Sequence, residues 1–300
     1  MTILNLASDG LPPILITLTS LVVHHKNISR DELINISVPH AGVASDKVRQ
    51  TLSKWTNLGL FVEDTGQIRM SVELSRGETA ELFADRLPTV CRNLALRSEH
   101  GDPLWSTDST ERSTGSTADL CRALSWWLAQ DIYTIPTDPE RIESLATMQL
   151  KAGYFIFMNK SNRWPGFRAW AKFLGFAVGD DSNIFCDITA ALRSDLMDIL
   201  KIGETISASE FISRLAARLP VLDTGYYRVE VEKVMRPEAW SAPPAGNLST
   251  AVSFALQRLQ KQGVIGFETR SDASSKLTLT RQGGRPWESF THVSLKRKLS

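Results

Sequence analysis

The sequence predicts an α+β fold that is mostly α and is built from tandem winged helix-turn-helix units. A stretch of helical apolar periodicity ends at a glycine and leads into two short β-like runs, and this pattern occurs three times in the 300 residues. The three glycines are Gly59, Gly175 and Gly263. In the first and third copies, apolar residues stand seven and four positions before the glycine. The alternative is that helix, glycine and hairpin simply follow one another, as they do in many α+β proteins.

The first unit is expected within an N-terminal domain of residues 1–97. A helix is predicted over Leu11–His25, and Ser29 is expected to cap a short second helix through a capping box with Glu32. Ser45 is expected to cap the third helix, which Gly59 ends in a left-handed conformation. The first wing follows this glycine.

A long helix is predicted over Arg76–Arg97, with Pro88 kinking or splitting it. Residues 98–117 are rich in small polar side chains and are predicted to form a polar linker or exposed loop. The middle helical and winged-helix domain is assigned to residues 118–200, with Pro165 expected at the first position of the helix that leads to Gly175.

The C-terminal winged-helix domain is assigned to residues 201–300. Either Asn247 or Ser249 is expected to cap its third helix, which is expected to end at Gly263. The β-like runs at 264–270 and 276–281 are predicted to pair as its hairpin. A strand is expected over Tyr226–Val234, and 287–300 is expected to be a basic tail.

Charge is unevenly distributed, although the formal net charge is only +1. Residues 247–300 carry nine basic and three acidic residues, a balance of +6, so the rest of the chain carries −5. Residues 144–179 contain five basic residues and no acidic one. Basic clusters without acid are typical of polyanion-binding surfaces, and the alternative for each is an ordinary solvated surface.

The motifs of several enzyme classes are absent from the sequence. It has no Walker-type phosphate loop, no Gly-x-Ser-x-Gly elbow and no Cys-x-x-Cys pair, and its five histidines form no ligand spacing. Cys91, Cys121 and Cys186 are expected to be reduced core thiols, which suits a cytoplasmic location. The apolar stretch Leu11–Val23 is too short for a membrane span. We therefore expect no catalytic residues, no cofactor, no metal and no membrane contact.

Candidate DNA-binding residues come from the third helices and wings, because the third helix of a winged-helix unit usually enters the major groove. Acidic wing tips at Glu63-Asp64 and Asp180-Asp181 would repel phosphate, so the third unit is expected to dominate binding. Phe254 on the outer face of its helix favours packing against another domain or protein. The candidates are Arg49 and Lys54 in the first unit, Arg163, Arg168 and Lys172 in the second, and Arg258, Lys261, Arg270 and Lys276 in the third.

Two segments, Met1–Pro13 and Asp119–Asp131, resemble the DpdG family, and the chain length is similar. That family belongs to bacterial gene clusters that place 7-deazaguanine derivatives in DNA and restrict unmodified DNA. The resemblance implies a role on the restriction, or defence, side of such a system. It brings no assigned functional residues to this sequence.

Taken together, these observations predict a non-enzymatic DNA-binding or adaptor subunit of a bacterial DNA modification and restriction system. Its expected partners are double-stranded DNA and the other subunits of that system. One alternative is a winged-helix transcriptional regulator, which would normally be a symmetric dimer on a palindromic site. The other is a purely protein–protein assembly subunit, since fold alone does not decide function.

Overall fold

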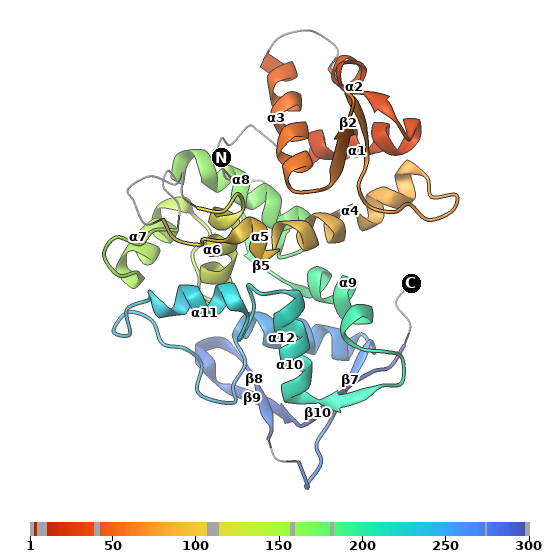
Figure 1. The fold of residues 1–300 in the computed structure, drawn as a ribbon. Helices are drawn as coiled ribbons and strands as arrows, with labels where there is room; N and C mark the ends of the chain where they lie inside the picture. Colours follow the sequence, from red (N-terminus) through yellow and green to blue (C-terminus); the bar gives the residue numbers. More distant parts are fainter. Residues whose placement is uncertain are drawn as a thin grey trace.

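The computed structural model describes residues 3–4, 11–38, 43–106, 114–156, 160–180, 183–273 and 275–297. Within them the chain is α+β, with helices joined to four small antiparallel sheets, so the predicted fold class is confirmed at this level. Helices α1–α3 lie at the top of Figure 1, and strands β7–β10 lie at the bottom. In this part of the chain no helix is both long and apolar enough to cross a membrane.

The described residues up to Met70 form three helices and a three-stranded sheet. Ser29 caps the second helix by accepting the Glu32 N–H at 3.2 Å, and Gly59 has a φ of 82° after the third, both as predicted. The third helix begins at Val43, so Ser45 lies inside it rather than at its cap. The elements are α1 (Pro12–His25), β1 (Ile28–Ser29), α2 (Arg30–Ser37), α3 (Val43–Asn57), β2 (Phe61–Asp64) and β3 (Gln67–Met70), and the sheet order is β1-β3-β2.

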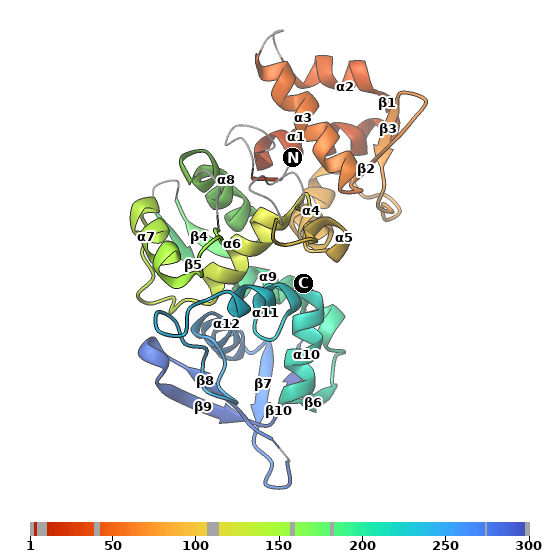
Figure 2. The same cartoon turned by 60° about the vertical axis from the view of Figure 1, so that its left-hand side comes forward.

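The middle of the chain is a helical layer that carries a two-stranded hairpin. The long helix is continuous through Pro88, and Pro165 lies inside its helix rather than at the first position. The elements are α4 (Ala80–Ala95), α5 (Ser98–Gly101), α6 (Ala118–Leu128), α7 (Pro139–Gln149), α8 (Lys160–Phe173), β4 (Ala177–Gly179) and β5 (Ile184–Cys186). All of α6 is buried, and Figure 2 shows it at the centre of the molecule.

The last third repeats the element order of the first, with insertions. Its three-stranded sheet has the order β6-β10-β7, and a separate hairpin pairs β8 with β9. The elements are α9 (Thr189–Ile199), β6 (Thr205–Ser207), α10 (Ala208–Arg218), α11 (Tyr226–Lys233), α12 (Thr250–Lys261), β7 (Ile265–Glu268), β8 (Leu277–Thr280), a 3₁₀ turn (Gln282–Gly284), β9 (Pro286–Phe290) and β10 (His292–Leu295). As predicted, Ser249 caps α12 and Gly263, at φ 67°, ends it.

Three predictions for this region are wrong. The runs at 264–270 and 276–281 do not pair, because β7 pairs with β10 and β8 pairs with β9. The supposed tail therefore contains two strands, and its buried Val293 and Leu295 were the missed signal; Lys298 lies outside the described residues. The expected strand over Tyr226–Val234 is helix α11, which packs on α6 through residues at helical spacing such as Tyr227 and Val231.

The two described ends of residues 98–117 are joined to each other by backbone hydrogen bonds. The Gly115 N–H donates to the Pro103 carbonyl at 3.1 Å, and the Thr117 N–H donates to the His100 carbonyl at 2.9 Å. Leu104 and Thr117 are buried. Residues 107–113, the centre of the predicted linker, lie outside the described residues.

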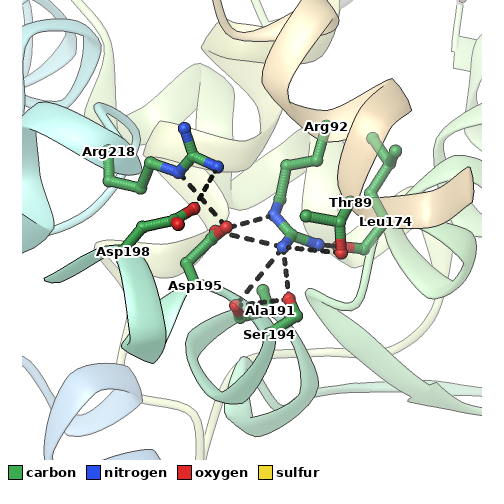
Figure 3. A network of polar contacts seen from close by, with 8 residues as sticks. All are labelled: Thr89, Arg92, Leu174, Ala191, Ser194, Asp195, Asp198 and Arg218. Atoms are coloured by element: carbon green, nitrogen blue, oxygen red, sulfur yellow. Dashed lines mark hydrogen bonds and ion pairs between the residues drawn. The ribbon is translucent and has the colours of Figure 1, made fainter. Parts of the chain in front are cut away.

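A buried ion network joins the middle of the chain to its last third (Figure 3). Arg92 of α4 donates from Nε and Nη2 to Asp195 Oδ2 of α9, at 3.2 and 3.0 Å, and from Nη1 to the Leu174 carbonyl after α8, at 2.8 Å. Arg218 of α10 donates to Asp195 Oδ1 at 3.2 Å. Because Asp195 is fully buried, its charge depends on these two guanidinium groups.

Candidate nucleic-acid interface

The outer face of α3 is polar and open to solvent. Val48, Leu52 and Trp55 turn into the core, and Trp55 packs on Trp170 of α8 with ring centroids 5.2 Å apart. The side chains opposite this apolar stripe are exposed or half-buried, and they can donate to or accept from phosphates and base edges. They are Asp46, Arg49, Gln50, Ser53, Lys54 and Asn57.

Arg30, at the start of α2, ties α3 to the β2–β3 hairpin. Its Nη1 donates to Glu63 Oε2 at 2.5 Å and its Nη2 donates to Ser53 Oγ at 2.9 Å. The Arg30–Glu63 ion pair places a positive charge beside Glu63. From the sequence alone, Glu63 was expected to repel phosphate. The sequence analysis did not select Arg30, although its position directly after the capping Ser29 was a usable signal.

The equivalent helix of the last third, α12, is mostly covered. Ser253 is 0% exposed, and its Oγ accepts the Thr280 N–H of β8 at 2.8 Å. Thr250 Oγ1 accepts the Ile132 N–H at 3.1 Å and donates to the Gln130 carbonyl at 3.3 Å, just beyond α6. The inserted hairpin and the segment after α6 therefore cover much of the side of α12 that a DNA groove would need.

The middle candidates are divided between core and surface. Arg163 is 4% exposed and its Nη1 lies 3.3 Å from Oδ2 of Asp119, which also accepts the Leu4 N–H at 3.1 Å. Since this ion pair is buried, Arg163 has no place in a DNA-binding surface. Arg168 and Lys172 are half-buried on α8. At the second wing tip Asp180 is exposed, whereas Asp181 lies outside the described residues.

The remaining candidates lie far from α3. Arg270 and Lys276 are exposed, but they flank the connection from β7 to β8 rather than the tip of one hairpin. Arg270 forms an ion pair with Glu268 at 2.8 Å, and this hydrogen bond lowers the pKa of Glu268. Figure 1 places α3 at the top and β7, β8 and β10 at the bottom. The structure therefore does not gather the candidates of the first and third units into one surface.

One comparison with known proteins gives a match. The model of the DpdG-like family matches residues 1–273. The chain belongs to the DpdG-like family. No curated protein and no solved structure matches the chain. The DpdG-like match includes both α3 and α12, and it ends four residues before β8, the strand whose backbone bonds to Ser253.

Proposed function

We propose that this DpdG-like protein is a DNA-binding adaptor subunit of a bacterial DNA modification and restriction system, and that it catalyses no reaction itself. We further propose that residues 12–70 form a winged-helix unit in which α3 contacts duplex DNA. Family membership supports the link to the modification and restriction system. The observation that carries the DNA proposal is the uncovered polar face of α3.

Geometry and side-chain chemistry both support a role for α3. Its unit has the order helix, strand, helix, helix, strand, strand, and the sheet order β1-β3-β2 sets the β2–β3 hairpin beside the third helix. Arg49, Gln50 and Asn57 are exposed there and include both donors and acceptors. Arg30 offsets the charge of Glu63 at the base of the wing.

The adaptor part of the proposal rests on the middle and last thirds. Buried ion pairs and the covering of α12 join these parts to each other and to α4. On the β4–β5 hairpin, the cross-strand neighbours Val178 and Phe185 are 47% and 56% exposed. Exposed apolar pairs favour a protein partner, so a purely protein–protein assembly role is the second candidate function.

A salt titration of duplex binding tests the DNA proposal. Arg49→Ala with Lys54→Ala removes two cations from the α3 face, and Arg270→Ala with Lys276→Ala is the matched control with the same charge change. The α3 double variant should flatten the slope of log affinity against log salt by roughly two units, since each phosphate contact contributes about 0.9. The control should keep the wild-type slope.

Two results would contradict the proposal. If only Arg270→Ala with Lys276→Ala flattened the salt slope, the duplex would bind near the β7–β8 connection and not at α3. Absence of wild-type binding at about 50 mM salt, where backbone contacts are strong, would favour the protein–protein role instead.

A further inference from the structure

One narrow face of α12 stays uncovered. It carries Phe254, Arg258 and Lys261 at positions i, i+4 and i+7, which lie on one side of a helix. Arg258 and Lys261 are exposed, and Phe254 is half-buried. The guanidinium of Arg258 lies 5.6 Å from the centroid of the Phe254 ring and is also paired with Asp187.

Aromatic side chains border this face on both sides. Tyr133, which is 42% exposed, packs edge-on against Phe254 with ring centroids 6.5 Å apart. Trp287 of β9 has the Arg281 guanidinium 3.9 Å from its ring centroid and Lys261 Nζ 5.8 Å from it. These six residues, Tyr133, Phe254, Arg258, Lys261, Arg281 and Trp287, are called the basic-aromatic strip below.

The two borders of the strip are within electrostatic reach of each other. Burial and the Asp131 carboxylate raise the pKa of Tyr133, and the charge of Arg281 opposes this shift. The Asp131 carboxylate accepts hydrogen bonds from the Tyr133 and Gly283 N–H groups. These bonds hold the backbone at Tyr133 next to the turn that precedes β9. Of the three cations, Arg258 is offset by Asp187, so Lys261 and Arg281 supply most of the positive charge.

We propose that the basic-aromatic strip binds single-stranded DNA, with bases stacked on its rings and phosphates beside Lys261 and Arg281. Aromatic platforms interleaved with cations are the usual chemistry of single-strand binding. A duplex does not fit, because β8 and the segment after α6 contact α12 at Ser253 and Thr250 and leave only a narrow face open. The choice of DNA over RNA rests on the proposed function, in which α3 holds the chain on a duplex.

Fluorescence anisotropy of the full-length chain with a labelled oligothymidylate tests this proposal. Tyr133→Ala removes an exposed ring and should weaken binding by roughly 5- to 150-fold, the range of one lost base stack. Tyr133→Phe keeps the ring and should bind within about twofold of wild type. The pair therefore separates stacking from any role of the hydroxyl group, and circular dichroism checks that both variants fold.

Control variants separate this proposal from the duplex proposal. Arg49→Ala with Lys54→Ala should leave oligothymidylate binding unchanged even where it weakens duplex binding, because α3 lies outside the strip. Lys261→Ala with Arg281→Ala should weaken oligothymidylate binding and flatten its salt slope by roughly 1.4, at about 0.7 per phosphate on a single strand.

Three outcomes would overturn the single-strand proposal: no oligothymidylate binding by wild type at about 50 mM salt, equal affinity of wild type and Tyr133→Ala, or tighter binding of oligouridylate. The last would assign the strip to RNA. If the basic-aromatic strip bound an acidic peptide and no oligonucleotide, its role would be to contact a protein.

Discussion

Helices α3 and α12 occupy the same place in two units with the same element order, yet α3 presents a broad polar face, whereas only a narrow face of α12 stays uncovered. In the first unit β2 and β3 form a short hairpin around Thr65-Gly66, and α3 stays free beside it. In the last unit the chain between β7 and β10 forms an additional hairpin, β8–β9, whose Thr280 N–H bonds to Ser253 of α12. An insertion between two strands can therefore turn a groove-facing helix into a core helix.

The two units also differ in how they are fixed to the rest of the chain. Helix α3 touches its neighbour through apolar rings, Trp55 on Trp170. The last unit is joined through buried polar groups, including Asp195 with Arg92 and Thr250 with Gln130. Buried polar contacts are costly to break singly, so the last unit is the more firmly attached of the two. The proposed duplex contact is assigned to the first unit.

The largest expected change in stability follows from breaking the buried ion pair between Arg92 and Asp195. Arg92→Ala leaves Asp195 buried with only Arg218 as ion partner, and it should lower the free energy of unfolding by about 3–5 kcal/mol. Arg218→Ala is the control: its side chain is partly exposed, and its loss should cost about 1 kcal/mol or less. Chemical denaturation measures both. Equal costs would mean that the network does not join the units.

An intermediate change in stability is expected at Ser253 of α12, and Ser53 of the equivalent helix α3 serves for comparison. Ser253→Ala removes the buried acceptor of the Thr280 N–H and should destabilise the protein by about 1–3 kcal/mol. Ser53→Ala on α3 removes only a partly buried acceptor of Arg30, and it should change stability by no more than about 0.5 kcal/mol. Thermal or urea unfolding checks the pair. A larger cost for Ser53→Ala would contradict the contrast between covered and open helices.

A small stability effect is expected at the β2–β3 hairpin of the first unit. Arg30→Ala breaks a half-exposed ion pair and should cost about 1 kcal/mol or less in unfolding free energy. It should nevertheless weaken duplex binding, because Glu63 then faces phosphate without its partner. Adding Glu63→Gln to Arg30→Ala should restore part of the affinity in the same titration. No difference between the single and double variants would show that Glu63 does not face DNA.

Local signals in the sequence predicted much of the fold. Ser29, Ser249, Gly59 and Gly263 mark helix ends through capping and left-handed backbone, and each does so in the structure. Strand pairing was not predictable in the last unit, because β7 bonds to a strand that begins more than twenty residues later. Periodicity shows which residues are apolar, but it does not show which of several β-like runs will become neighbours.

The candidate site was predictable only in part. Spacing alone identified the polar face of α3, including Arg49 and Lys54. The same reasoning selected Arg163, whose partner Asp119 lies 44 residues earlier in the chain, so its burial was not visible from local pattern. Net charge favoured the last unit, but charge balance does not show that tertiary contacts cover its helix.

Photo-crosslinking tests the central claim, that α3 rather than α12 meets duplex DNA, most directly. A blunt-ended duplex that carries 5-iododeoxyuridine only at central paired positions offers no single strand to the label, and mass spectrometry of the crosslinked peptides locates the contact. We expect crosslinks within α3 and the β2–β3 wing, and none within α12. Crosslinks confined to α12 or to the β7–β8 connection would contradict the account.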